Sequence, residues 1–364
     1  MGHFVVPNQI FGNGPAQTNH RREDVPPRYQ LFGNKGSLDR QDVLKDTRNT
    51  WNMITSIFLL CWIYLHSTAF AFVVFLPSPR DFKLNKLFSI SVPRNNEDLT
   101  KEMISLRRRL LQGGKSYGPV CMSDSPIVLE ILAMSGYGHM IIDHEHAPTD
   151  ILSSQHMLQA MDAAAVYSKH GRTEPIIRLP TADTAYMKKV LDSMRLPGGV
   201  LVPMVEDAIT AKKAVESTRY PRAGIRGCAV PFIRGSGWGS NLDYMRQCEE
   251  DLLVMVQVET PLGVEAIEEI AAVGGVDGIF LGPLDLSCSL GKMGQFNDPE
   301  VQSLISQAEK AILKSSCFLA GFRSQNRDLK EMFDICYSLI CGSLDLGLLR
   351  EASRLDVEAA NRVL

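Results

Sequence analysis

The sequence predicts a (β/α)8 barrel, the TIM-barrel α/β fold, preceded by an N-terminal extension. From Leu106 onward, short apolar runs alternate with amphipathic stretches, which is the pattern of strands followed by helices. Eight such pairs in about 260 residues match the count and size of one barrel. A doubly wound sheet is the alternative, but it usually has fewer strands and a Gly-rich first turn, and the chain has no GxGxxG motif.

The elements follow one another regularly along the chain. The expected strands are the apolar runs 117–122, 139–143, 175–179, 199–203, 253–258, 278–281, 318–321 and 339–342. The expected helices are the amphipathic stretches 126–135, 152–169, 182–194, 206–217, 261–272, 299–314, 326–335 and 348–363. Because a helix follows every strand, the strands should run parallel and close into a single barrel.

The composition of the chain divides it into four regions. Residues 1–50 are polar and show no sustained apolar period, so we expect a disordered tail. Residues 51–76 contain no Asp, Glu, Lys or Arg and are long enough to cross a bilayer. Residues 77–104, with several prolines and mixed charge, are expected to form a linker, and residues 105–364 the barrel.

The apolar segment 51–76 has two main interpretations, because a buried core helix would have nothing to pack against. It can be a permanent membrane anchor, or a cleavable targeting signal that begins at Met53 rather than Met1. Residues 67–72 (STAFAF) resemble the Ala/Phe cleavage motif of bipartite plastid presequences. We expect delivery to an organelle, with the plastid as the candidate, and the alternatives are a membrane-anchored or a cytoplasmic enzyme.

Charge and cysteine content exclude other classes of protein. The formal net charge is −3 and the pI is about 6.3, which argues against a dominant role in nucleic-acid binding. The eight cysteines form no CxxC pair, and a chain of this length does not need disulfides for stability. Zinc ribbons and disulfide scaffolds are therefore excluded.

Polar residues stand at the carboxyl ends of several expected strands, where the catalytic residues of barrel enzymes lie. The second strand runs into Asp143-His144-Glu145-His146, the third carries Arg178, the fifth carries Gln257 and Glu259, and the sixth ends at Gly282-Pro283-Leu284-Asp285. Because these strand ends meet at one face of a barrel, the sequence predicts an active site there.

Four blocks of sequence resemble the metal-dependent pyruvate aldolases of the HpcH/HpaI aldolase/citrate lyase family, which include 2,4-dihydroxyhept-2-ene-1,7-dioic acid aldolase. The blocks are GYGHMIIDHEHAPTD (136–150), PIIRLP (175–180), RAGIRG (222–227) and VQVETPLGVEAIEEIAAVGGVDGIFLGPLDLS (256–287). The similarity spans roughly residues 105–350. It implies a barrel of the phosphoenolpyruvate/pyruvate type.

Two carboxylates, Glu259 and Asp285, are the expected metal ligands. Hard divalent cations such as Mg²⁺ or Mn²⁺ accept a few carboxylates and complete their shell with water and substrate oxygens, and Co²⁺ or Zn²⁺ is the alternative. The resemblance implies that the metal chelates the carboxylate and keto oxygens of a 2-oxo acid and stabilises the enolate. The competing interpretation of Asp285 is a helix cap.

The resemblance also assigns the remaining site residues. His146 matches the base that moves the proton of the C4 hydroxyl, and either Asp192 or the nearby Asp143 would raise its proton affinity. Arg178 would bind the keto oxygen or the developing enolate charge. Gln257 and the backbone amide around Leu284 match positions that hold the substrate.

Some residues depart from the family pattern. His144 stands where glycine is common, so it would narrow the site or offer zinc or cobalt a further ligand. Leu284 stands where a small residue is usual and would crowd the methyl group of the substrate. The Gly-rich stretch 222–239, which contains Arg226, is expected to cover the mouth, bridge protomers or serve as a plain connector. The last strand and helix fit only loosely.

The expected function is a divalent-metal-dependent class II aldolase, which cleaves a 4-hydroxy-2-oxo acid to pyruvate, or a close analogue, and an aldehyde. The alternatives are a citramalyl- or malyl-thioester lyase, and a non-catalytic, membrane-tethered barrel that binds a 2-oxo acid. The resemblance implies a homo-oligomer, a hexamer with exchanged C-terminal helices. The expected partners are small-molecule substrates and, through 51–76, a membrane, but no nucleic acid.

Overall fold

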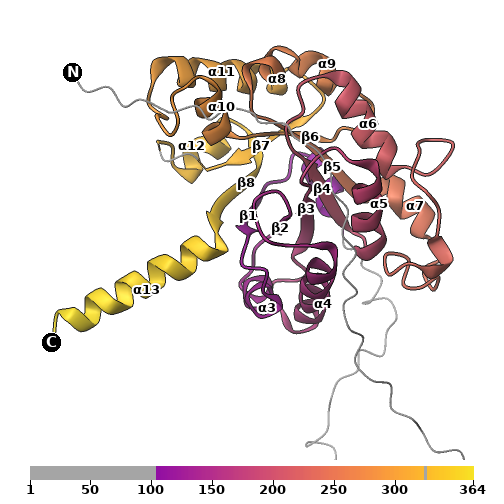
Figure 1. The fold of residues 1–364 in the computed structure, drawn as a ribbon, viewed down its shortest axis with the longest axis horizontal. Coiled ribbons are helices and arrows are strands. Elements are labelled where there is room, and N and C mark those ends of the chain that lie inside the picture. Colours follow the sequence, from indigo (N-terminus) through magenta and orange to yellow (C-terminus); the bar gives the residue numbers. More distant parts are fainter. Residues whose placement is uncertain (1–103, 324–325) are drawn as a thin grey trace, which may run out of the picture. The chain divides into compact units, whose positions relative to one another are not determined.

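The structure, a computed structural model, describes residues 104–323 and 326–364, which contain a closed barrel of eight parallel strands (Figure 1). The strands follow the order of the sequence, and β8 pairs with β1 to close the barrel. They are β1 Ser116–Cys121, β2 His139–Asp143, β3 Glu174–Arg178, β4 Gly198–Val202, β5 Leu252–Val258, β6 Gly278–Leu281, β7 Phe318–Phe322 and β8 Tyr337–Leu344. The predicted fold class is confirmed, and every expected strand overlaps an observed one.

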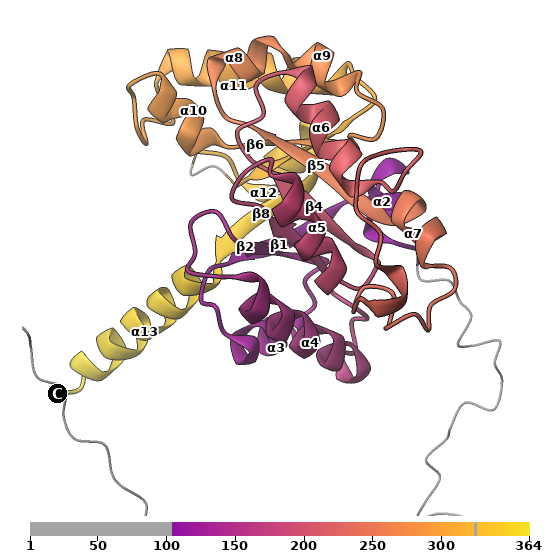
Figure 2. The same ribbon diagram turned by 45° about the vertical axis from the view of Figure 1, so that its right-hand side comes forward.

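Helices surround this sheet, with α3 and α4 on one side and α8, α9 and α11 on the opposite side (Figure 2). The helices are α2 Leu106–Leu111, α3 Pro126–Met134, α4 Ile151–Tyr167, α5 Thr184–Ser193, α6 Ala208–Thr218, α7 Tyr244–Glu250, α8 Pro261–Glu265, α9 Ile267–Ala271, α10 Pro283–Ser289, α11 Pro299–Leu313, α12 Leu329–Asp334 and α13 Asp345–Asn361. The short helices α2, α7 and α10 were not expected from the pattern. The expected helix 261–272 is divided into α8 and α9 at Ala266.

Side chains of the strands alternate between two apolar cores. Val120, Ile141, Ile176 and Met255 point into the barrel, whereas their chain neighbours pack against the surrounding helices. Because successive residues of a strand point to opposite faces, a strand covered on both faces must be apolar throughout. This is why the expected strands are continuous apolar runs.

The barrel has two ends, which we call the base, at the amino ends of the strands, and the mouth, at their carboxyl ends. Helix α2 closes the base, because Leu106 is buried in the inner core and its amide donates to Glu174 Oε1 at 2.6 Å. Arg107 donates from Nε to both carboxylate oxygens of Asp277, at 3.0 and 2.9 Å. The barrel domain therefore begins with α2, before its first strand.

The connection between α6 and α7 also lies at the base. Its backbone bonds to the last turns of two helices that run from mouth to base, through Ile225 N to Glu216 O and Gly235 N to Asp192 O, both at 2.9 Å. The Gly-rich stretch 222–239 belongs to this connection. It therefore does not cover the mouth of its own barrel, as one of the expectations held.

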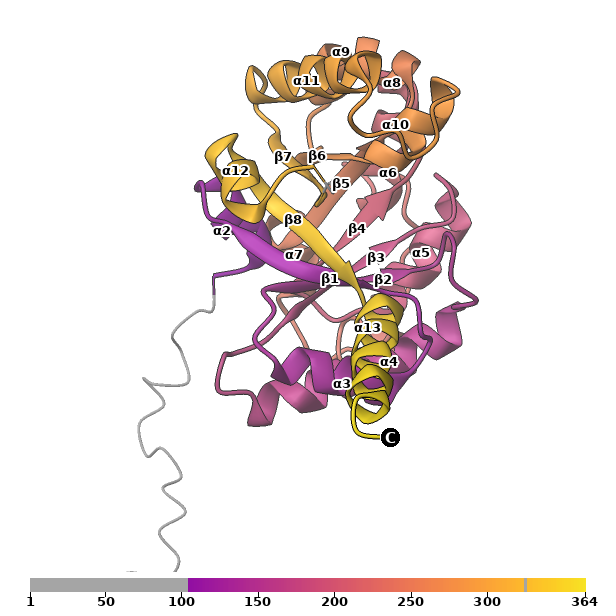
Figure 3. The same cartoon turned by 90° about the vertical axis from the view of Figure 1, so that its left-hand side faces the viewer.

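Helix α13 does not pack along its own barrel, but extends away from it (Figures 1 and 3). Only its first residue, Asp345, is buried, and its carboxylate accepts hydrogen bonds from the amides of Met122 and Ser123 at 2.9 and 3.0 Å. The exposed positions of α13 include Leu349 and Leu355. The last helix fits the barrel pattern of the sequence only loosely because it does not pack against its own barrel.

The predicted tail 1–50, the apolar segment 51–76 and the linker up to residue 103 lie outside the described residues. Within the part of the chain that the structure does describe, no helix combines the length and apolar character needed to cross a membrane.

Candidate active site

The carboxyl ends of β2 and β3 place an acid and a cation side by side at the mouth. Asp143 and Arg178 are register partners at the ends of these strands, and both side chains are buried. Arg178 donates from Nε and Nη2 to the two carboxylate oxygens of Asp143, each at 2.8 Å. This bidentate geometry holds the guanidinium plane in a fixed orientation.

Glu145 is a site residue that the sequence analysis did not select. Its Oε2 lies 3.1 Å from Nη1 of Arg178 and 3.5 Å from Nε2 of His146. Its amide donates to Asp143 Oδ1 at 3.0 Å, which fixes the turn after β2. The only signal for Glu145 in the sequence was its position directly before His146, the expected general base of the reaction. A lone acid in a loop is normally a solvated residue.

Glu259 is buried at the end of β5 and lies on the inward face together with Gln257, two residues earlier. Its Oε1 accepts the amide of Met204 at 2.8 Å, and its Oε2 accepts the amide group of Gln257. Met204 has a φ of 53°, a left-handed conformation that is uncommon outside glycine, and this conformation accompanies the amide contact with the carboxylate. The Oε1 of Gln257 is buried without a hydrogen-bond partner.

Gly282 leads the chain from β6 to Asp285 past the Glu259 carboxylate. A β-carbon at Gly282 would lie 2.7 Å from Glu259 Oε2, so only glycine allows this close approach. Asp285 then falls in the first turn of α10, half-buried, and neither it nor any other side chain caps that helix. The helix-cap interpretation of Asp285 is therefore not supported.

The carboxylates at the mouth influence one another. Burial raises the pKa of Glu259 to about 7, the negative charges of Asp285 and Glu145 add to the shift, and the hydrogen bonds from Gln257 and Met204 oppose it. Burial likewise raises the pKa of Glu145, against the opposing effect of Arg178. A cation placed between neighbouring carboxylates favours their charged forms.

This cluster fits a divalent cation that is held by few protein ligands. In the described residues, no group of three or more His, Cys, Asp and Glu side chains is arranged to hold a metal ion alone. Glu259 and Asp285 would supply two oxygen ligands, and hard cations such as Mg²⁺ keep several waters or substrate oxygens in such sites. The observations that support this fit are the buried Glu259 carboxylate and, on the same strand face, the buried Oε1 of Gln257, which has no hydrogen-bond partner.

The two histidines after β2 differ in their surroundings. His146 is 59% exposed at the mouth, and its ring contacts the carboxylate of Glu145. His144 is buried, with Nδ1 at 2.9 Å from the hydroxyl of Tyr186 on α5, and burial lowers its pKa to about 4. His144 therefore packs toward the helix layer against Tyr186, and its role as a further metal ligand stays a prediction.

Asp192 lies at the opposite end of the molecule from His146. It is in the last turn of α5, and this 10-residue helix carries the chain ~15 Å from the mouth toward the base. Its Oδ1 accepts a hydrogen bond of 2.7 Å from Nη2 of the buried Arg226, which also bonds the hydroxyl of Tyr244. The structure brings six predicted residues to the mouth (Asp143, His146, Arg178, Gln257, Glu259 and Asp285, with Leu284 beside them), but not Asp192.

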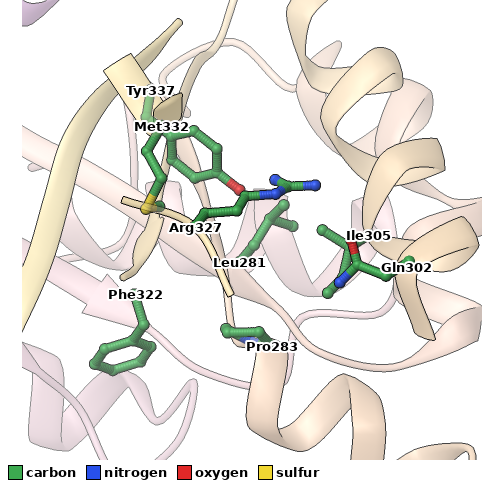
Figure 4. A pocket seen from close by; sticks show the side chains of 8 residues that line it. All are labelled: Leu281, Pro283, Gln302, Ile305, Phe322, Arg327, Met332 and Tyr337. Atoms are coloured by element: carbon green, nitrogen blue, oxygen red, sulfur yellow. The ribbon is translucent and has the colours of Figure 1, made fainter. Parts of the chain in front are cut away.

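A small cavity lies behind the mouth, between the barrel wall and helices α11 and α12 (Figure 4). Its volume is about 10 Å³, room for one water molecule. It is lined by Leu281, Pro283, Gln302, Ile305, Phe322, Arg327, Met332 and Tyr337. None of the clustered carboxylates lines it, so it is not the substrate site, although the ring of Phe322 also faces Arg178 at 5.9 Å.

Known proteins are similar to the barrel in both sequence and fold. The family model of the HpcH/HpaI aldolase/citrate lyases matches residues 120–351. A hydroxypyruvate/pyruvate aldolase of Deinococcus radiodurans is 37% identical over 63% of this chain and 79% of its own length. A 5-keto-4-deoxy-D-glucarate aldolase of Enterobacter sp. strain 638 is 36% identical over 63% of this chain and 86% of its own.

A solved structure agrees with these relatives. A HpcH/HpaI family protein from Burkholderia cenocepacia J2315 superposes with a TM-score of 0.65 at 31% identity, covering 70% of this chain and 98% of its own. The match includes the strand ends that carry Asp143, Arg178, Glu259 and Asp285. The family and the enzyme class predicted from the sequence are confirmed: the chain belongs to the HpcH/HpaI aldolase/citrate lyase family.

Proposed function

We propose that this protein is a divalent-metal-dependent aldolase that cleaves a 4-hydroxy-2-oxo acid to pyruvate, or a close analogue, and an aldehyde. The observation that supports this most strongly is that Glu145, Glu259 and Asp285 lie close enough at the mouth to act on one another, beside Arg178, which Glu145 contacts. Such an excess of buried negative charge has no structural benefit, but it suits an enzyme that binds a cation and an anionic substrate together.

The residues at the mouth divide the chemistry among them. Glu259 and Asp285 would hold the cation, which when bound supplies Lewis-acid stabilisation of negative charge on the substrate. Arg178 has five N–H groups, of which two donate to Asp143, and its Nη1 also lies 3.1 Å from the Glu145 carboxylate, so others remain to donate to the 2-oxo oxygen. That oxygen gains negative charge as the carbon–carbon bond breaks, so this donation strengthens during the reaction.

His146 would remove the proton of the 4-hydroxyl group, which starts the cleavage. Its exposure at the mouth leaves the ring accessible to a substrate. The free Oε1 of Gln257 and the backbone near Leu284 would orient the 2-oxo acid. The leaving fragment is the enolate of pyruvate, which then takes up a proton, and the other product is the aldehyde.

The direct test is a screen for pyruvate release from 4-hydroxy-2-oxo acids, including 5-keto-4-deoxy-D-glucarate, with Mg²⁺, Mn²⁺, Co²⁺ or Zn²⁺. We expect turnover that EDTA abolishes and that added metal restores. Malyl and citramalyl thioesters form the comparison arm of the screen. Undiminished turnover after EDTA treatment, or cleavage of the thioesters alone, would contradict the proposal.

We also propose that the chain works as a homo-oligomer, a hexamer by resemblance, in which a second copy covers α13. The exposed leucines of this helix, including Leu349 and Leu355, have no cover in one protomer. Light scattering of the full chain should show an oligomer. The double substitution Leu349→Glu and Leu355→Glu should shift it to smaller species, whereas an unchanged mass in this variant would contradict the role of α13.

For the apolar segment 51–76, we propose a role in delivery to an organelle. Supporting this, the segment contains no Asp, Glu, Lys or Arg, and its residues 67–72 resemble the Ala/Phe cleavage motif of bipartite plastid presequences. N-terminal sequencing of the mature protein tests the proposal. A start after Ala69 supports cleavage at the signal, and an intact segment in a membrane fraction supports an anchor instead.

A further inference from the structure

We propose that the hydrogen bond between His144 and Tyr186 positions the loop that carries His146, so that both are positioning residues of the reaction. The inference rests on the proposed aldolase function, in which His146 is the base. It starts from the loop itself, residues 145–149, which joins β2 to the N-cap of α4. Within the described residues the main chain of His146 makes no hydrogen bond, so the loop depends on the anchors at its two ends.

His144 is the anchor before this loop, and it is held at two points. Its amide donates to the carbonyl oxygen of Arg178 at 2.9 Å, which ties it to the end of β3. Its imidazole is buried, and Nδ1 lies 2.9 Å from the hydroxyl of Tyr186 on α5, with the two rings edge to face at 5.8 Å. Glycine, which is common at this position of the family pattern, could make only the first of these contacts.

Tyr186 is a rigid partner for the imidazole. The carboxylate of Asp183, the N-cap of α5, accepts the amide of Tyr186 at 2.6 Å. The ring of Tyr186 packs against the apolar core between the strands and the helices. Because helix and core already fix the hydroxyl group, its bond to His144 transmits the position of α5 to the loop.

The contact acts on catalysis through position rather than through charge. Burial lowers the pKa of His144 to about 4 and raises the pKa of Tyr186, and the nearby carboxylates of Asp143, Asp150 and Asp124 have smaller effects. Neither group therefore titrates between about pH 6 and 9. A displaced base slows the reaction equally throughout this range, whereas binding of the 2-oxo acid uses the ends of β3, β5 and β6 and is unaffected.

The experiment compares Tyr186→Phe, His144→Leu, His144→Asn and the double variant Tyr186→Phe/His144→Leu with the wild type. Pyruvate release between about pH 6 and 9 gives kcat and KM, and hydrogen exchange followed by mass spectrometry reports the opening of loop 145–149 without turnover. Tyr337→Phe is the matched control, because its hydroxyl bonds Glu309 Oε1 at 2.8 Å, away from this loop. A thermal melt of each variant confirms that it is folded.

We expect Tyr186→Phe to lower kcat about tenfold at every pH, the scale of one lost hydrogen bond, and to leave KM within about twofold. His144→Leu should match it, and the double variant should lose no more than either single variant. His144→Asn should keep most of the rate, because its side-chain amide can still bond the hydroxyl. Exchange of the loop should rise only in the variants that lose rate, and Tyr337→Phe should keep its kcat.

The inference is overturned if Tyr186→Phe keeps its kcat, if it raises KM instead, or if Tyr337→Phe loses as much. It is also overturned if His144→Asn loses as much as His144→Leu. Should His144→Leu fail to fold, Tyr186→Phe decides alone, since it removes only one hydroxyl. Absence of turnover in the wild type would count against the aldolase, whereas unchanged loop exchange in Tyr186→Phe would count against the positioning role.

Discussion

At the base of the barrel Arg107 meets Asp277, whereas at the mouth Asp143 and Glu145 contact Arg178, and Glu259 and Asp285 add further negative charge beside them. The base pair is matched one to one, and Asp277 also accepts the amide of Val254 at 2.9 Å. The mouth holds an excess of negative charge that its one buried guanidinium does not balance. The same residue types thus stabilise the fold at one end and prepare a reaction at the other.

The difference between the two ends has a physical reason. A buried charge without a partner costs several kcal/mol, so a site that only stabilises the fold pairs every charge. A binding site must leave charge available for its ligand, and the folded chain is then less stable than it could be. Buried charges that lack a partner of opposite sign therefore distinguish the functional end of the barrel from the structural end.

The largest effect is expected when a carboxylate is neutralised at the mouth. Glu259→Gln should lower kcat/KM by at least about 10³-fold, because a ligand of the cation is lost. The melting temperature should not fall, because the buried charge is removed and its shape is kept. Pyruvate release and a thermal melt measure the two effects. Metal-dependent turnover within tenfold of the wild type would break the comparison.

The converse result is expected at the base. Arg107→Ala should cost about 3–5 kcal/mol of unfolding free energy, because the buried Asp277 loses its partner. The kcat of the folded protein should stay within about twofold of the wild type. Arg108→Ala is the matched control, since this neighbour is itself 35% exposed, pairs with Glu250 and Asp251 near the surface, and should cost about 1 kcal/mol or less. If urea unfolding shows that Arg107→Ala and Arg108→Ala lose the same unfolding free energy, the prediction is refuted.

The pH dependence of stability sharpens the comparison next. The pKa of Glu259 rises from 4.5 in the unfolded chain to about 7 in the folded one. Between these two pH values the folded, metal-free chain therefore holds a proton that the unfolded chain has lost. The contribution of Glu259 to the free energy of unfolding is complete below its unfolded pKa. It is lost as the pH rises through the folded pKa, by up to about 3 kcal/mol. Urea unfolding of EDTA-treated protein at pH 5 and pH 8 measures this difference. Glu259→Gln should lack it, and Mn²⁺ at pH 8 should recover the loss.

The smallest effect is expected from the apolar edge of the mouth. Leu284 is exposed beside Asp285, where it would limit the size of the aldehyde portion. Leu284→Ala should raise kcat/KM for long substrates relative to short ones by about tenfold, the scale of one or two methylene groups in an apolar pocket. Kinetics on a homologous series of aldehydes would show it, and an unchanged ratio would place Leu284 outside the site.

The sequence by itself determined the fold class, the strands and most of the mouth. Strands buried on both faces must be apolar, so they stand out as runs, and their carboxyl ends in a barrel must converge. Residues such as Arg178 and Glu259 could be selected for this reason alone. Short helices such as α2 and α10 carry too few residues to show a period, and the sequence did not reveal them.

Only the tertiary structure decided which side chains meet. Asp192 and His146 were associated by resemblance, but the direction of α5 carries Asp192 to the base and to Arg226. Glu145 was passed over because a loop acid has no distinguishing pattern, yet the neighbouring strand places it between Arg178 and His146. The period of a sequence fixes the face on which a residue lies, whereas its contacts depend on chain directions and helix lengths that no local pattern encodes.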